Sequence, residues 1–148
     1  MGYTAAPDGW WQEFVGGSPV RTAKLAVVRA DGSPQVVPVW VALDTVNGID
    51  EIVFTTGAAT VKGKAIARDP RVSLCWDDEH PPFNFVMIRG TARTSDDTDE
   101  VHRWAGILGS RYMGADREKE YAERNGVPGE LLVRVTPEQV VAKVDVAD

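Results

Sequence analysis

The sequence predicts a mainly β protein whose strands form a closed antiparallel barrel of six or seven strands, with helices at the periphery. Short segments rich in β-branched residues recur along the chain and are separated by turn signals such as Asp31-Gly32-Ser33-Pro34 and Asn47-Gly48. Helical patterns are few, and they do not alternate with the strands as in a parallel βαβ sheet. With 148 residues, of which 43% are hydrophobic, the chain suits a single domain over residues 1–148.

The first half of the chain predicts a helix followed by an antiparallel meander. Residues 7–15 suit a short amphipathic helix that ends at Gly16-Gly17. Three strands are expected, at residues 20–29, 35–43 and 51–56. Pro38 interrupts the second of these strands, and because proline cannot donate to a ladder, that strand should be bulged or lie at an edge.

The second half predicts the remaining helices and strands. Residues 60–68 suit a short helix that stops before Pro70, because proline disfavours helical backbone at the residue before it. Residues 95–97 supply an N-cap for a helix that runs to about Leu108, and another helix is expected over residues 117–124. The apolar residues of the longer helix share one face that should meet the core: Val101, Trp104, Ala105 and Leu108. The remaining strands are expected at residues 72–76, 83–94, 131–135 and 139–144.

Composition excludes several classes of partner. Acidic residues outnumber basic ones by 22 to 16, which gives a net charge of -6 and a pI near 4.9. Such a field repels phosphate backbones and anionic membranes, so neither nucleic acid nor a membrane is expected as a partner. Cys75 is the single cysteine, so no disulfide forms within the chain. Without a signal peptide or a membrane-spanning run, the expected location is the cytoplasm.

Most common catalytic motifs are missing from the sequence. The two histidines, His80 and His102, fall in no metal-binding spacing, and adjacent acids at residues 77–79 are more typical of a solvated loop, so no metal is expected. There is no Gly-x-Ser-x-Gly elbow, and Cys75 lies within an apolar strand, where a thiol is normally inert. Walker and Gly-x-Gly-x-x-Gly loops are also missing from the chain. Nucleophilic, ATP-dependent and Rossmann-type chemistry are therefore not indicated.

The segment from Phe54 to Arg71 is the strongest candidate for a binding site. Hydroxyl and backbone donors at the end of a strand precede a helix that is basic within an acidic protein. The donors are Thr55, Thr56, Gly57 and Thr60, and the basic residues are Lys62, Lys64, Arg68 and Arg71, against Asp69 alone. Helix N-termini, hydroxyls and lysines together suit a phosphate or another small anion. An ordinary capped and solvated helix is the alternative interpretation.

The chain resembles the flavin- and deazaflavin-binding split β-barrel proteins, the superfamily of pyridoxamine-phosphate oxidase. The resemblance covers most of the chain, and it is carried by three spaced motifs rather than by any one of them. These are residues 31–40 (DGSPQVVPVW), Lys62 with residues 67–74 (ARDPRVSL), and the strand 86–92 with its Arg89-Gly90. It is most similar to the bacterial branch that uses the deazaflavin coenzyme F420.

The resemblance implies a set of cofactor-binding residues. Lys62 aligns with a lysine that contacts the cofactor phosphate, helped by Thr55, Thr60 and Lys64. Pro38, Val39 and Trp40 align with the strand that lies along the tricyclic ring. Members are typically homodimers with cofactor at the interface, so Phe83 and Phe85 are expected to reach the ring bound by the partner subunit. Flavin-using relatives often place an arginine near the phosphate where this chain has Thr60, which favours the deazaflavin over FMN.

The implied activity is that of a cytoplasmic oxidoreductase with a small-molecule substrate. Reduced coenzyme F420 would donate a hydride to an electron-poor carbon, such as the β-carbon of an α,β-unsaturated carbonyl, and no catalytic residue of the protein is singled out. Three alternatives stay open. They are an FMN-dependent oxidoreductase of the pyridoxamine-phosphate oxidase type, a non-catalytic cofactor carrier, and an interaction domain that binds neither cofactor.

Overall fold

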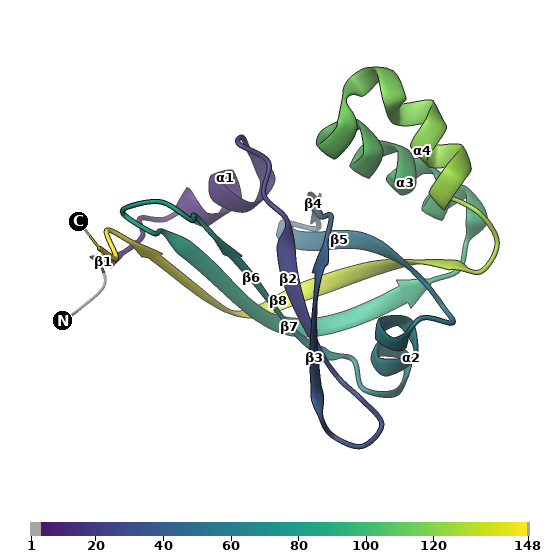
Figure 1. Ribbon diagram of the computed structural model, residues 1–148, viewed down its shortest axis with the longest axis horizontal. Helices are drawn as coiled ribbons and strands as arrows, with labels where there is room; N and C mark the ends of the chain where they lie inside the picture. The colour runs from purple at the N-terminus through teal and green to yellow at the C-terminus, as the bar shows by residue number, and fades with distance from the viewer. Residues whose placement is uncertain (1–3, 148) are drawn as a thin grey trace.

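Eight antiparallel strands form one sheet in the computed structural model, which describes residues 4–147 (Figure 1). The strands are β1 (Thr4–Ala5), β2 (Ala23–Val28), β3 (Pro34–Val39), β4 (Ala42–Val46), β5 (Ile49–Gly57), β6 (Arg71–Asp77), β7 (Phe85–Ser95) and β8 (Glu130–Val144). Their hydrogen-bonded order is β3-β2-β6-β7-β8-β5-β4, with β1 paired to the C-terminal end of β8. The predicted mainly β split barrel is confirmed. Its ladder does not close, because β3 and β4, consecutive in the chain, are the two ends of the order.

The helices lie around this sheet. They are α1 (Trp10–Gly16), α2 (Val61–Arg68), α3 (Thr98–Met113), the 3-10 helix η1 (Ala115–Arg117) and α4 (Glu118–Asn125). Figure 1 shows α3 and α4 side by side on one side of the β7–β8 ribbons and α2 on the other side. None of the helices within residues 4–147 is long and apolar enough to cross a membrane.

The predicted division into strands differs from the structure at two places. The strand expected over residues 35–43 is divided into β3 and β4, because the backbone N–H of Val41 donates to the Tyr112 hydroxyl at 3.0 Å instead of to a neighbouring strand. The two strands expected around Thr136-Pro137 are one continuous strand, β8. The pairing of β7 with β8 has a register shift next to Pro137. Arg89 pairs with Gln139, whereas the next residue, Gly90, pairs with Pro137.

The predicted helices are present with shifted ends. Helix α1 begins at Trp10 rather than residue 7, and the helix expected over residues 117–124 is η1 followed by α4. Helix α3 continues five residues beyond the predicted end at Leu108. Its N-cap is Asp97, whose carboxylate accepts from the backbone N–H groups of Asp99 and Glu100.

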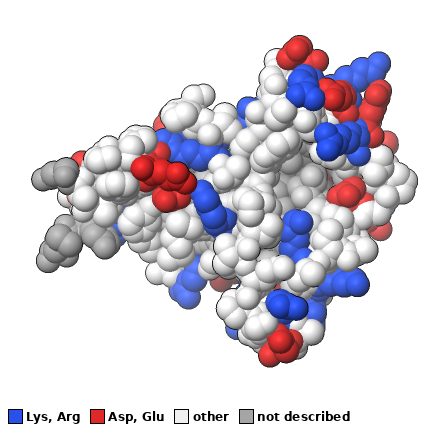
Figure 2. Space-filling view, in the orientation of Figure 1, with Lys and Arg blue, Asp and Glu red and all other residues white. Residues whose placement is uncertain are grey.

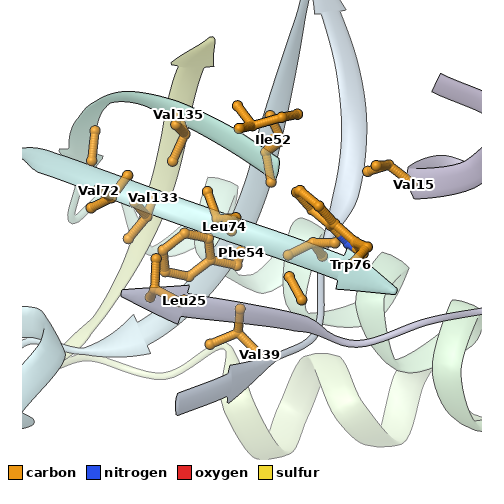
Figure 3. Close-up of a cluster of buried hydrophobic side chains, with 14 of the residues drawn as sticks. Val15, Leu25, Val39, Ile52, Phe54, Val72, Leu74, Trp76, Val133 and Val135 are labelled. Carbon is orange, nitrogen blue, oxygen red and sulfur yellow. The ribbon is translucent and has the colours of Figure 1, made fainter. Parts of the chain in front are cut away.

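Side chains pack on both faces of part of the sheet. On the inner face, alternate residues of the strands interdigitate around the fully buried Phe54 and Trp76 (Figure 3). On the outer face, the predicted apolar stripe of α3 is confirmed, since Val101, Trp104 and Leu108 bury Val53 of β5 and Leu132 of β8. Because the middle of β5 is buried on both faces, Ile52, Val53 and Phe54 form a short continuous apolar run rather than an alternating pattern.

A buried carboxylate links β5, β7 and β8 beside the start of α3. Glu51 is only 4% exposed, and it accepts from both terminal nitrogens of Arg93, one of them at 2.8 Å, and from the Thr136 hydroxyl at 3.2 Å. Arg134 lies 3.5 Å from Glu51 and 2.8 Å from Asp44. The hydrogen bond from Arg93 is the main cause that holds the pKa of Glu51 below its ordinary value of 4.5.

We expect Glu51→Gln to lower the free energy of unfolding at neutral pH by about 2 kcal/mol, since charge-assisted hydrogen bonds are lost. The carboxylate of Glu51 has a lower pKa in the folded state than in the unfolded state. It therefore stabilises the fold when the pH is above its unfolded-state pKa, and this stabilisation is lost as the pH falls through its folded-state pKa. Urea unfolding from pH 7 to pH 3 should therefore show a shallower acid dependence for Glu51→Gln than for the wild type. Parallel curves for the two proteins would contradict this role.

Candidate functional site

A cavity of about 430 Å3 lies where β3, β5, α2, α3 and α4 meet. Its volume falls in the range of about 300–1,000 Å3 that is typical of small-molecule sites. The lining residues are Thr22, Pro38, Val39, Trp40, Thr55, Lys62, Ala105, Leu108 and Asn125. Figure 2 shows the molecular surface hollowed below the α3–α4 pair, with basic side chains close to the hollow. Since no aspartate or glutamate belongs to this lining, the cavity suits an anion.

Trp40 forms part of an aromatic cluster at the cavity wall. Its ring stacks on Tyr112 of α3, with centroids 5.1 Å apart and planes within 4° of parallel. Tyr121 of α4 meets the same indole at 5.6 Å in a tilted arrangement. The two tyrosines hold Trp40 against the helices, and the same side chain lines the cavity. Trp40 therefore both packs against α3 and α4 and forms part of the cavity wall.

The end of α3 fixes the backbone next to Trp40. The Tyr112 hydroxyl donates to the Arg21 carbonyl at 2.7 Å and accepts from the Val41 N–H. Arg111 donates to the carbonyls of Val15, Gly16 and Val41 at 2.6 to 3.1 Å. These bonds join the end of α1, the segment before β2 and the β3–β4 link at one point.

Helix α2 is held against the end of β5 by a dense set of hydrogen bonds. The Thr60 hydroxyl caps the helix by accepting from the Gly63 N–H at 3.1 Å, and it donates to the Gly57 carbonyl at 2.7 Å. Because its one hydrogen is used in this way, the hydroxyl of Thr56 donates to it at 3.1 Å. A Cβ at Gly63 would come within 2.2 Å of the Gly57 carbonyl oxygen, so glycine permits this close approach.

The four basic residues of the segment from Phe54 to Arg71 have different surroundings in the structure. Lys62 lines the cavity and has no carboxylate partner among residues 4–147. Arg68 donates to the Val28 carbonyl at 2.8 Å, and Arg71 pairs with Asp69 at 2.7 Å, which lowers the pKa of Asp69 to about 2. Lys64 is exposed on α2 and does not line the cavity. Only Lys62 is therefore both unpaired within the described chain and directed at the cavity.

The structure brings together half of the predicted site. Pro38, Val39, Trp40, Thr55 and Lys62 line one cavity. Thr56, Gly57 and Thr60 lie beside it as the support of α2, with their polar groups bonded to one another. Phe83 is 41% exposed in the loop between β6 and β7, where it lines a separate hollow with Lys24, Cys75 and Phe85. The structure contains one chain, so a contact between Phe83 and a partner's cavity stays a prediction.

Sequence reasoning missed the helical half of the cavity. Ala105 and Leu108 were assigned to the core stripe of α3, and they also line the cavity beside Asn125, the last residue of α4. Thr22 belongs to the segment before β2. An asparagine before a glycine is a common helix-stop signal, and no local pattern marks Asn125 or Thr22 as cavity residues.

Comparison with known proteins gives the family. A family model described as pyridoxamine 5'-phosphate oxidase matches residues 11–143, and the chain belongs to this family. Comparison with curated proteins finds no match. The resemblance inferred from the motifs in residues 31–40 and 67–74 is confirmed.

Solved structures share the fold over nearly the whole chain. The conserved hypothetical protein Rv2991 from Mycobacterium tuberculosis has a TM-score of 0.80 and 23% identity, with 98% of this chain and 89% of that one covered. A structure named F420 reductase has a TM-score of 0.68 and 25% identity, with coverage of 91% and 98%. HutZ, the heme storage protein from Vibrio cholerae, has a TM-score of 0.61 and 16% identity, with coverage of 82% and 85%. The family and the fold are those of the oxidoreductase-like, flavin-type split barrels.

The capping role of Thr60 gives a test of how α2 is positioned. We expect Thr60→Ala to lower the free energy of unfolding by about 1 kcal/mol, because the cap at Gly63 is lost, whereas Thr60→Ser should keep it. Urea unfolding at neutral pH measures both values. Equal stability of Thr60→Ala and the wild type would mean that the hydroxyl is not an effective cap.

Proposed function

We propose that this chain is a cytoplasmic oxidoreductase dependent on coenzyme F420, which transfers a hydride to an electron-poor carbon of a small molecule such as an α,β-unsaturated carbonyl. The observation that carries the proposal is the cavity with one unpaired lysine, an aromatic wall and no carboxylate in its lining. Membership of the pyridoxamine 5'-phosphate oxidase family supports a flavin-type cofactor, and the likeness to an F420 reductase supports the deazaflavin.

The cavity residues fit such a cofactor by their chemistry. The ammonium of Lys62 and the hydroxyl of Thr55 suit its phosphate, and no carboxylate in the lining competes for that lysine. Trp40, Val39 and Pro38 offer an apolar wall for a flat ring system. When bound, the reduced cofactor supplies the hydride. The contribution of the chain is then to bind, to orient and to exclude water.

The proton that completes the reduction comes from solvent in this proposal. Among the residues that the structure describes, the cavity lining contains no aspartate, glutamate, histidine, cysteine or tyrosine, and Lys62 is assigned to the phosphate. An enolate formed by hydride addition is basic enough to be quenched by water. Activity should therefore depend on the positions of cofactor and substrate more than on a titrating group of the protein.

The likeness to an F420 reductase is what favours the deazaflavin over FMN. FMN stays the alternative cofactor, and storage of the cofactor without turnover is the alternative role.

The first experiment is a parallel titration of the apo protein with FMN and coenzyme F420, followed by tryptophan fluorescence. We expect quenching and a lower Kd for F420, and then turnover of an enone such as 2-cyclohexen-1-one with the reduced cofactor. Tighter FMN binding would transfer the assignment to an FMN oxidoreductase. Tight F420 binding with no turnover of any activated alkene would favour the carrier, and binding of neither cofactor would overturn the proposal.

We expect Lys62→Ala to raise the Kd for coenzyme F420 about tenfold or more, because a charge-assisted hydrogen bond is worth about 1.5–3 kcal/mol. The matched control is Lys64→Ala, which removes an equal charge from the same helix outside the cavity and should change the Kd less than threefold. Equal losses in the two variants would mean that the effect is only long-range attraction, which high salt would abolish.

We also propose a homodimer formed through the sheet face opposite the barrel core. On the outer face of β6, β7 and β8, half-buried apolar side chains stand in register across three strands: Cys75, Met87 and Val141. Phe83 and Phe85 flank this row beside Cys75. Burial of such a row against a second copy would remove apolar surface from water, and it would bring these phenylalanines toward a partner's cavity.

We expect Met87→Glu to convert the dimer to a monomer, because the second copy would have to bury two unpaired carboxylates. Light scattering coupled to size exclusion measures the mass. Glu123→Gln, a change on the exposed face of α4, is the control and should stay dimeric. A monomeric wild type would overturn the dimer, whereas a Met87→Glu dimer would place the interface elsewhere.

A further inference from the structure

We infer that Thr22 and Asn125 recognise the carbonyl oxygen of the substrate, and that they make a neutral carbonyl compound the substrate class of this cavity. The inference rests on the proposed function and deepens it. The two residues come from the segment before β2 and from the last turn of α4, and they line the same cavity as Lys62.

The inference begins with polar side chains that have no partner. Four polar residues line the cavity, and none of their side chains makes a hydrogen bond or ion pair within residues 4–147: Thr22, Thr55, Lys62 and Asn125. The neighbouring hydroxyls of Thr56 and Thr60 are both used by the support of α2. Half-buried donors without a partner in the protein suit the binding of a ligand that can accept hydrogen bonds from them. Such a ligand would satisfy polar groups whose desolvation otherwise costs free energy.

The four residues differ in charge and in the elements that carry them. Thr55 and Lys62 come from β5 and α2 and form the cationic part of the lining. Thr22 and Asn125 are neutral. Asn125 lines the cavity together with the apolar Ala105 and Leu108 of α3, whereas Thr22 directly precedes Ala23, which pairs with Val39 of β3. Neutral donors among apolar side chains favour a neutral carbonyl over a second anion, because an anion there would lose its hydration without a compensating charge.

The helical wall is also the part of the cavity that is separate from the barrel. Helix α4 packs mainly on α3 and η1, and it meets the site through Tyr121 and Asn125. Ala105 has a small side chain beside Asn125, so the wall leaves space there. The part of the lining with Lys62 is thus assigned to the cofactor, and Asn125 and Thr22 are assigned to the substrate.

Donors at this position would act on the reaction as well as on binding. Hydride addition to the β-carbon of a bound enone, with the reduced cofactor as the hydride source, would move the alkene π pair to the α-carbon and carbonyl and place negative charge on the oxygen. Water would then protonate the α-carbon, so that the alkene is reduced at the expense of the cofactor. The Asn125 amide and the Thr22 hydroxyl can donate to that oxygen, and the bonds strengthen as its charge grows.

The test uses three variants and two separate readouts. Asn125→Ala and Thr22→Val remove one donor each, and Asn125→Asp replaces the amide by a charged acceptor of the same shape. The first readout is the Kd for coenzyme F420 from tryptophan fluorescence. The second is the Kd for 2-cyclohexen-1-one on the protein loaded with oxidised F420, measured by ligand-observed NMR, followed by kcat and KM with the reduced cofactor.

We expect Asn125→Ala and Thr22→Val to weaken enone binding about 3- to 10-fold each and to lower kcat, because a neutral hydrogen bond is lost. Asn125→Asp should lose more, since its charge repels the developing oxyanion. The Kd for F420 should change less than twofold in the two neutral variants. Glu123→Ala, on the exposed face of the same helix, is the matched control and should change none of these values.

Two results would overturn the inference while leaving the proposed function intact. A Kd for F420 that rises in parallel with the enone Kd would assign Thr22 and Asn125 to the cofactor. Unchanged enone binding and kcat in Asn125→Ala and Thr22→Val would show that neither residue touches the substrate. Failure of the wild type to bind F420 would overturn the proposed function itself, and the inference with it. A melting temperature for each variant separates loss of the fold from loss of the contact.

Discussion

The position of Trp40 depends on the last turn of α3, where two adjacent side chains bond to backbone from three other parts of the chain. Arg111 donates to carbonyls at the end of α1 and at Val41, and the Tyr112 hydroxyl bridges Arg21 and Val41. Backbone polar groups at a break between strands have no ladder partner, and they would be costly to bury unpaired. These two side chains satisfy them and so allow β3 and β4 to part at the cavity.

This junction also couples the barrel to the helices. The Tyr112 ring stacks on Trp40, while its hydroxyl bonds the backbone of the next residue, Val41, and of Arg21, so the indole is fixed at its face and at the adjoining main chain. Close packing of α4 on α3 then brings Tyr121 to the same indole. A Cβ at Gly109 would come within 2.2 Å of the Tyr121 Cβ, so glycine is what allows the two helices to approach this closely.

Local signals indicated Thr55 and Lys62 of the cavity and the family resemblance implied Pro38, Val39 and Trp40, but neither indicated the helical wall. Pro38 marked an edge strand, Thr60 a helix start and Pro70 a helix end, because each acts through its own backbone or its near neighbours. The join of residues 130–144 into one strand could not be predicted, since it depends on how Pro137 pairs with Gly90 across strands. Asn125 was equally hidden, because only the packing of α4 on α3 brings it to Lys62 and Trp40.

The protein is negatively charged, whereas the lining of its cavity is positively charged. Ion pairs that hold nearby carboxylates outside the cavity account for this difference. The protein carries a net charge of -6, yet the cavity lining contains Lys62 and no acid. Asp69, which follows α2, is held by Arg71, and Glu51 on β5 is held by Arg93 and Arg134 on the outer face of the sheet. These two carboxylates are thus paired away from the site. Lys62 has no carboxylate partner within residues 4–147, and a low local dielectric in the cavity strengthens its attraction for an anion.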